Sequence, residues 1–293
     1  MYELNRYNQA LRSQIQDWLA EDVGYGDITT ETTVAEGHRS KAVIHAKESG
    51  VIAGLPVARL VFDTVDPSLS FRALVNDGDR VEKGTILAEV EGGTHSLLTG
   101  ERLALNLMQR LSGIATKTRA FVDALEGLPV RLVDTRKTTP GHRLLEKYAV
   151  RVGGGANHRF GLYDAVMIKD NHIKAAGGIR PAVERSRAVI PHTMKIEVEA
   201  ESLAQVEEAL EAGADIIMLD NMAPSLMKEA VAVIKGRSPH VVVEASGNVR
   251  LDTVRGIAET GVDVISVGGL TYSFQALDIS LDLNGKKAGG APQ

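Results

Sequence analysis

The spacing of hydrophobic residues changes twice along this chain of 293 residues. Near the N-terminus apolar residues recur every three or four positions, which predicts an amphipathic helix. Its apolar positions are Leu4, Tyr7, Leu11, Ile15 and Trp18. Between residues 40 and 92 the apolar runs are short and separated by glycine- and aspartate-containing turns, a pattern typical of short strands. Only residues 55–65 have helical spacing in this stretch.

A long helix is predicted next, over residues 97–125. One face of it is formed by Leu97, Glu101, Ala104, Met108, Leu111, Ala115, Thr118, Val122 and Leu125. Gly113 lies near the middle, where a helix could break. We place the domain boundary on this helix: residues 1–112 form an N-terminal α+β domain with hammerhead-like strands, residues 113–285 a βα domain and residues 286–293 a disordered tail.

Beyond residue 128, six apolar runs alternate with helical segments, which predicts βα units and a parallel sheet. The runs cover residues 130–134, 165–169, 195–199, 215–220, 241–245 and 262–269. The clearest helical segments cover residues 181–190, 202–214, 225–236 and 251–261. Six strands are two short of a complete eight-stranded barrel, so an incomplete barrel and an open sheet both remain.

Polar residues decide between these two architectures, because nearly every predicted strand ends in side chains able to do chemistry. In a βα barrel such strand ends converge on one mouth. We therefore predict an α/β fold in which an N-terminal α+β open sandwich domain precedes an incomplete, six- to seven-stranded C-terminal βα barrel.

Composition narrows the class of protein. With 44% hydrophobic and 24% charged residues, the chain is neither disordered nor fibrous. The net charge of -5 argues against a nucleic-acid binder. Cysteine is absent, which excludes disulfides, thiolate nucleophiles and cysteine-bound metals. No signal peptide and no apolar run long enough to span a membrane can be read, so we expect a cytoplasmic protein without a membrane partner.

Cationic side chains gather at the strand ends and in the glycine-rich segment 153–161. They are Arg136, Lys137, His158, Arg159, Lys169, His172 and Lys174. Any one of these side chains alone is typical of a solvated surface charge. Together they would repel one another without a ligand, so the set predicts a pocket for a polyanion bearing phosphates or carboxylates.

Two glycine-containing strand ends favour phosphate. Ser246, Gly247 and Asn248 precede a helix predicted to begin near residue 251, and Gly268 and Gly269 precede one predicted over 271–277. Bare backbone N–H groups at such positions let an anion approach closely.

Two carboxylates, Glu199 and Asp220, end neighbouring strands. They have the oxygen ligands that Mg²⁺ prefers, but they would equally serve as ion-pair partners orienting Lys137 or Lys169. Glu197 points to the same side of its strand as Glu199, so the sequence does not choose between the two glutamates.

Three common nucleotide and metal motifs are missing: the P-loop, the dinucleotide-binding glycine motif and the zinc-protease helix. Residues 75–92 resemble the hammerhead of biotinyl and lipoyl carriers. Their turn has no lysine for a prosthetic group, so we interpret them as scaffold.

Longer motifs resemble one family over residues 10–280. EDVGYGDITT, GERLALNLMQRLSGIAT, DTRKTTPGHR, GGGANHRFGLYDAVMIKDNH, EVEAES, IMLDN, EASGN and ISVGGLT are similar, in this order, to the quinolinate phosphoribosyltransferases. The resemblance implies transfer of a phosphoribosyl group from 5-phosphoribosyl 1-pyrophosphate (PRPP) to quinolinate. The products would be nicotinate mononucleotide, pyrophosphate and CO2, in NAD biosynthesis and with Mg²⁺ present.

The resemblance also implies roles for particular residues. Arg136, His158 and Arg159, with Arg102, would bind the quinolinate carboxylates. Lys137 and Lys169 would reach the pyrophosphate and the carboxylate next to the ring nitrogen. Glu199 and Asp220 would hold the ribose hydroxyls and the metal. The 5-phosphate would lie on Ser246, Gly247, Asn248, Gly268 and Gly269.

Arg102 lies on the long helix, away from any strand end. The family places the corresponding arginine in the neighbouring subunit's site, which implies a homodimer with active sites at the subunit interface.

Three alternatives remain open at this stage. One is a related enzyme of the same superfamily acting on nicotinate or another base. The second is a phosphosugar lyase or aldolase that forms a Schiff base on Lys137 or Lys169. The third is a non-catalytic anion-binding protein.

Overall fold

The computed structural model describes residues 8–283, which divide into two compact units. The first unit comprises the chain up to Lys117 together with the segment from Phe274, and the second comprises Thr118–Ser273. Positions Leu4 and Tyr7 of the predicted opening helix and the predicted tail 286–293 lie outside the described residues. Among residues 8–283, no helix combines the length and apolar character needed to cross a bilayer.

The first unit is built on an antiparallel sheet in the order β12-β1-β5-β3. Its strands are β1 (Arg39–Ala46), β3 (Ser70–Ala73), β5 (Ile86–Gly93) and β12 (Ile279–Leu283). The smaller pair β2 (Gly50–Val51) and β4 (Arg80–Val81) is also antiparallel. The predicted short strands are thereby confirmed, but no pattern in the sequence predicted β12.

Strand β12 changes the predicted domain range. The prediction assigned residues up to 285 to the barrel domain, whereas β12 pairs with β1 from Ala42↔Leu283 to Ala46↔Ile279. The last described strand therefore belongs to the sheet of the first unit, because β1 has an edge that β12 completes.

The helices of the first unit are α2 (Asn8–Val23), α3 (Ile28–Thr33), α4 (Leu55–Val65) and the beginning of α5 (Thr94–Ala124). The predicted helix over 55–65 is confirmed: Pro56 lies in its first turn, and Val57, Val61 and Phe62 are buried. Hydroxyls on α5 hold the chain after β2, since Ser112 Oγ accepts the N–H of Ala53 at 3.0 Å.

Gly113 does not break α5, which runs continuously from Thr94 to Ala124. A Cβ at this position would lie 2.1 Å from the carbonyl oxygen of Gln275. The glycine is needed for the close approach of a neighbouring backbone, so the expectation of a break is wrong.

The second unit carries six parallel strands in the order β6-β11-β10-β9-β8-β7. They are β6 (Arg131–Val133), β7 (Val166–Ile168), β8 (Ile196–Ala200), β9 (Ile216–Asp220), β10 (Val242–Ser246) and β11 (Val264–Ser266). The first strand pairs with the last, and the cycle is open only between β6 and β7, where a single bridge joins Val133 to Ala156. This order confirms the incomplete βα barrel.

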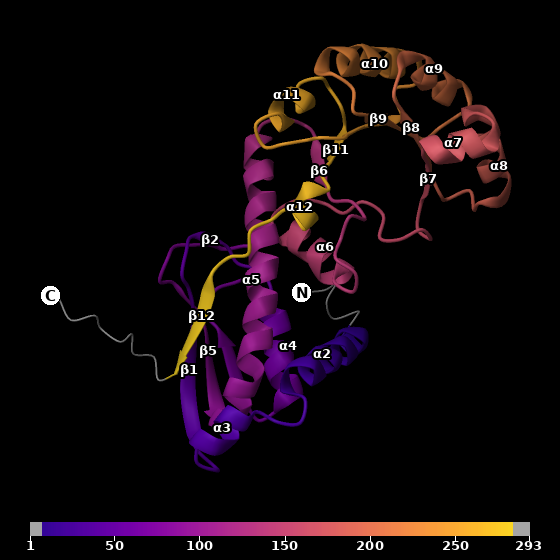
Figure 1. The fold of residues 1–293 in the computed structure, drawn as a ribbon. Helices are drawn as coiled ribbons and strands as arrows, with labels where there is room; N and C mark the ends of the chain where they lie inside the picture. The colour runs from indigo at the N-terminus through magenta and orange to yellow at the C-terminus, as the bar shows by residue number, and fades with distance from the viewer. Residues whose placement is uncertain (1–7, 284–293) are drawn as a thin grey trace. The chain divides into compact units, whose positions relative to one another are not determined.

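Helices connect the strands of this sheet (Figure 1). They are α6 (Arg143–Val152), α7 (Asp170–Ala176), α8 (Ile179–Val189), α9 (Leu203–Glu211), α10 (Pro224–Arg237) and α11 (Val254–Ala258). The short helix α12 (Gly269–Tyr272) follows β11, the last strand of this sheet in the chain. Parallel strands require such crossovers, and they leave all six carboxyl ends at the same edge of the sheet. The predicted helix near 251 begins later, at Val254, and the one predicted over 271–277 is the short α12.

Candidate active site at the strand ends

A cavity of about 510 Å³ opens at the carboxyl ends of the six strands. Every predicted site residue of the second unit lines it: Arg136, Lys137, His158, Arg159, Lys169, Glu199, Asp220, Ser246, Gly247, Asn248, Gly268 and Gly269. The remaining predicted residue, Arg102, lies on α5 in the first unit, with 57% of its side chain exposed.

Two predicted cations are not part of the lining. His172 Nδ1 accepts the N–H of Lys169 at 3.0 Å, which caps the start of α7. Lys174 pairs with Asp170 at 2.9 Å on the same helix. Both residues therefore serve the local structure of α7, and the cationic set at the cavity is smaller than the sequence predicted.

Both backbone polar groups of Lys137, the N–H and the carbonyl, form hydrogen bonds with threonine side chains. Its N–H donates to Thr135 Oγ1 at 3.1 Å, and its carbonyl accepts the hydroxyl of Thr271 at 2.9 Å. A Cβ at Gly268 would lie 2.9 Å from Lys137 Cδ. Glycine at 268 therefore leaves the room that the lysine side chain occupies.

The carboxylates at the ends of β8 and β9 lie close together, as predicted. Glu199 Oε2 accepts a hydrogen bond from Lys169 Nζ at 2.7 Å. Burial, and then the charge of Glu199, raise the pKa of Asp220. Carboxylate oxygens of Glu199, Asp220 and Glu201 all lie within 4.8 Å of one another. This donor set fits a hard divalent cation. Glu199 also forms an ion pair with Lys169, which is the alternative role that the sequence left open.

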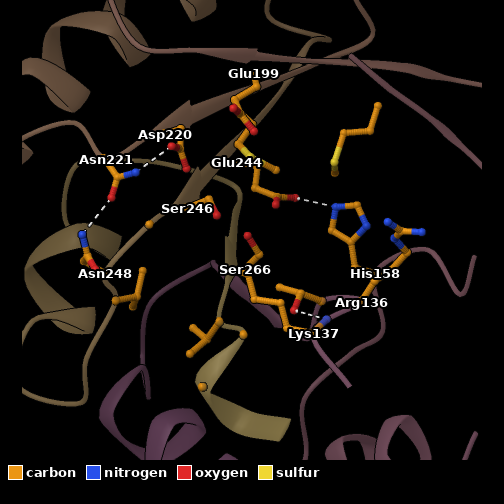
Figure 2. A pocket seen from close by; sticks show the side chains of 18 of the residues that line it. Arg136, Lys137, His158, Glu199, Asp220, Asn221, Glu244, Ser246, Asn248 and Ser266 are labelled. Atoms are coloured by element: carbon orange, nitrogen blue, oxygen red, sulfur yellow. Dashed lines mark hydrogen bonds and ion pairs between the residues drawn. The ribbon is translucent and has the colours of Figure 1, made fainter. Parts of the chain in front are cut away.

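Glu197 lies deeper, with 3% exposure, and contacts His158, which Figure 2 shows bonded to Glu244 as well. His158 Nε2 lies 3.3 Å from Glu197 Oε2 and 3.3 Å from Glu244 Oε2, and its Nδ1 accepts the N–H of Arg159 at 2.8 Å. Burial disfavours the charged ring, but the hydrogen bonds and charges of the two glutamates outweigh it and raise the pKa of His158 to about 10. The structure thus separates the two glutamates of β8: Glu199 lines the cavity and Glu197 supports His158.

The peptide of His158 is clamped by a buried ion pair. Lys147 Nζ bonds Asp134 Oδ1, and both side chains are fully buried. Asp134 also accepts the N–H of His158 at 2.9 Å, while Lys147 Nζ donates to the His158 carbonyl at 3.0 Å. Asn157 Nδ2 bonds the second oxygen of Asp134 at 2.6 Å. Three side chains, joined by four hydrogen bonds, therefore fix the backbone at the point where the chain passes the cavity.

Arg159 follows in the same segment, and its Nη1 donates to the carbonyl of Ala165 at 3.0 Å. Asp164 closes the loop by accepting the N–H groups of Phe160 at 2.6 Å and Gly161 at 3.0 Å. Burial raises the pKa of Asp164, but these backbone N–H bonds outweigh it, so the pKa lies below its usual value.

The glycine-containing end of β10 is shaped by two asparagines with left-handed backbone, Asn221 (φ 53°) and Asn248 (φ 49°). Asn248 Nδ2 donates to Asn221 Oδ1 at 3.0 Å, and Asn221 Nδ2 donates to Asp220 at 2.6 Å. Gly247 has φ 93°, and a Cβ there would lie 2.3 Å from Asn221 Oδ1. Only glycine fits between these strand ends.

Sequence reasoning gave no role to several lining residues: Thr135, Met167, Met218, Asn221, Glu244, Val249, Ser266, Val267 and Tyr272. Strand alternation could have found four of them, because each precedes a predicted site residue by two positions and shares its face of the strand: Met167, Met218, Glu244 and Ser266.

The fold and this site define a class of protein: α/β barrels with a cation-lined cavity at the carboxyl ends of parallel strands. The model of the quinolinate phosphoribosyl transferase C-terminal domain matches residues 114–282, and that of the N-terminal domain matches residues 27–112. The chain belongs to the quinolinate phosphoribosyl transferase family.

Curated relatives agree with this assignment. The chain is 51% identical to a probable nicotinate-nucleotide pyrophosphorylase [carboxylating] from Synechocystis sp., over 92% of this chain and 91% of the relative. It is 44% identical to a protein of the same name from Bacillus subtilis, over 93% of each chain.

Solved structures of similar proteins have the same fold. NadC from Streptococcus pyogenes is 44% identical, with a TM-score of 0.88 and 97% of each chain covered. The nicotinate-nucleotide pyrophosphorylase from Francisella tularensis is 39% identical, with a TM-score of 0.89 over 94% of this chain and 97% of that one.

Proposed function

We propose that this protein transfers the phosphoribosyl group of PRPP to quinolinate with loss of CO2, giving nicotinate mononucleotide and pyrophosphate for NAD biosynthesis. One observation carries the proposal: in a member of this family, Arg136, Lys137, Arg159 and Lys169 converge on one cavity. The two substrates together carry two carboxylates, a phosphate and a pyrophosphate. Charge-assisted hydrogen bonds to these groups would offset the mutual repulsion of the cations.

We assign a separate region of the cavity to each part of the substrates. Arg136, His158 and Arg159 form the side that we assign to the quinolinate carboxylates. Lys137 and Lys169 lie where they would neutralise the pyrophosphate and the carboxylate beside the ring nitrogen. Glu199 and Asp220 would bind the ribose hydroxyls. The 5-phosphate would rest on the backbone N–H groups of Ser246, Gly247, Asn248, Gly268 and Gly269.

In the transfer step the bond between the anomeric carbon and pyrophosphate breaks, and the quinolinate nitrogen attacks that carbon. Lys137 and Lys169 would stabilise the negative charge that develops on the leaving group, and Glu199 and Asp220 the positive charge on the ribose. No covalent enzyme intermediate is required. When the bond between the ring carbon and the adjacent carboxylate breaks, CO2 leaves and its electron pair stays on the ring carbon, stabilised by the neighbouring cationic nitrogen. That carbon then takes up a proton from solvent, so CO2 loss is chiefly the substrate's own chemistry.

We also propose that the enzyme uses Mg²⁺, held by Glu199 and Asp220. The clustered carboxylate oxygens and the raised pKa of Asp220 support this assignment, because a divalent cation would relieve their repulsion. When bound, Mg²⁺ would neutralise charge on the pyrophosphate oxygens.

A homodimer completes the proposed site. Arg102 has an exposed guanidinium, 3.9 Å from the carboxylate of Glu101. We propose that it enters the cavity of a second copy of the chain and binds a quinolinate carboxylate there. The absence of cysteine suits a reducing compartment, and we propose a cytoplasmic location.

The deciding experiment incubates the purified protein with PRPP, Mg²⁺ and either quinolinate or nicotinate, and follows mononucleotide formation and CO2 release. Mononucleotide and CO2 from quinolinate alone are expected. Product from nicotinate alone would identify a related transferase of the superfamily, and no product from either base would refute the proposed reaction.

A further inference from the structure

Two buried carboxylates have no part in the reaction as derived above. Glu197 on β8 and Glu244 on β10 are each 3% exposed, and their side chains converge across β9 on His158. One oxygen of each, Oε1, has no hydrogen-bond partner among the described residues. Burying charged groups with part of their capacity unsatisfied is unfavourable for folding, so these carboxylates need an explanation.

A metal centre does not explain them. The three side chains could surround an ion by distance, since their ligand atoms lie within 4.8 Å of one another. However, Nδ1 of His158 already accepts the N–H of Arg159, so in the neutral ring the proton must be on Nε2. In the charged ring both nitrogens carry protons. Either way Nε2 is a donor facing two carboxylate oxygens and has no lone pair for a metal.

The remaining interpretation is that the two glutamates fix the position of His158. Glu197 and Glu244 hold the ring by its Nε2–H, and Asp134 and Lys147 hold the peptide of the same residue. Arg159 directly follows His158 in the chain, so fixing the ring and the peptide of His158 constrains the backbone from which the Arg159 guanidinium projects. Figure 2 shows Arg136 beside His158, on the opposite side of the ring from Glu244.

We propose that Glu197 and Glu244 are positioning residues: they fix His158, and through it the backbone of Arg159, so that the quinolinate side of the cavity is preformed. This inference rests on the proposed function, because it assigns that side of the cavity to the base. Two acceptors on separate strands restrain the ring better than one, and they remain hydrogen-bonded whichever charge state the ring has.

The test compares Glu197→Gln and Glu244→Gln with Glu197→Leu and Glu244→Leu. The leucine variants remove both acceptor oxygens at similar volume, whereas glutamine keeps one. We expect leucine to raise KM for quinolinate roughly 10-fold or more, because one strong hydrogen bond to the ring is lost. KM for PRPP should change much less. Glutamine should restore most of the loss.

Nitrogen-15 NMR of the His158 ring gives a second readout that needs no turnover. In the unaltered protein we expect a downfield, slowly exchanging Nε2 proton, retained in the glutamine variants. In each leucine variant, where one acceptor remains, this signal should shift upfield and exchange faster. The matched control is Glu208→Leu on α9. Glu208 accepts the N–H of Ile179 at 3.1 Å and does not line the cavity, so this variant should lose stability but keep both KM values and the ring signal.

Equal increases in the two KM values, or a loss of stability alone, would show that the glutamates are merely structural. An unchanged Nε2 signal in the leucine variants would also overturn the proposal. If the unaltered protein does not convert quinolinate, the proposed function fails, and the NMR comparison still decides whether the glutamates hold the ring.

Discussion

Lys147→Met tests whether the buried ion pair behind the cavity stabilises the second unit. The substitution keeps most of the side-chain volume and removes the amine. Asp134, fully buried, would keep only the N–H of His158 and the Nδ2 of Asn157 as partners. Burial already raises the pKa of Asp134, and Lys147 is the largest influence opposing that rise.

The expected loss follows from the burial of both partners. Removing one member of a buried pair costs about 3–5 kcal/mol, because the other charge remains without compensation. In a domain of this size each kcal/mol lowers the melting temperature by about 2–4 °C, so the midpoint should fall by roughly 6–20 °C.

The assay is thermal unfolding followed by circular dichroism, with Lys228→Met as the control because Lys228 is exposed on α10. The control should stay within about 0.5 kcal/mol of the unaltered protein. Asp134→Asn and the double variant complete a cycle, in which removing both charges should cost less than the sum of the single losses. A Lys147→Met protein that melts within about 2 °C of the unaltered one would refute the reasoning, as would strict additivity.

Four further predictions concern the site and its assembly. Gly247→Ala should abolish turnover while the protein still folds, because the new Cβ would lie 2.3 Å from Asn221 Oδ1; an active variant would contradict this reading of the strand end. Asp164→Asn should make stability less sensitive to acid. The pKa of Asp164 is lowered in the folded protein, so its carboxylate stabilises the fold above the unfolded pKa of 3.8, and this stabilisation is lost as pH falls through the folded pKa. Melting curves of both proteins between about pH 5 and pH 3 would reveal the difference. Arg102→Ala and Lys137→Ala should each be inactive but regain some activity when mixed, and no recovery in mixed dimers would exclude a shared site. Chelation of Mg²⁺ with EDTA should stop product formation until Mg²⁺ is restored, and full activity in EDTA would exclude a role for the metal.

Most of the order of helices and strands could be predicted from local sequence patterns. Periodicity is a local property of the chain, and it found the helix over Leu55–Val65, the long helix α5 and all six barrel strands. It also placed chemically active residues at the strand ends. Because parallel strands carry these ends to one edge, the sequence predicted which cations and glycines line one cavity.

Some elements had no local signal. Helix α6 was missed because it buries Glu146 and Lys147 on the face where apolar residues are expected. Strand β12 is short and is stabilised by pairing with β1, which lies far away in the sequence. Both elements are stabilised by contacts with residues that are distant in the sequence and come close only when the chain folds.

Which charged side chains pair with one another could not be predicted from local patterns. Glu197 and Glu199 are indistinguishable by strand alternation, yet Glu199 pairs with Lys169 at the cavity and Glu197 supports His158 beneath it. The choice depends on side chains from other strands, and the strength of each pairing depends on burial. Neither is encoded in local periodicity, because both arise when distant segments pack together and exclude water.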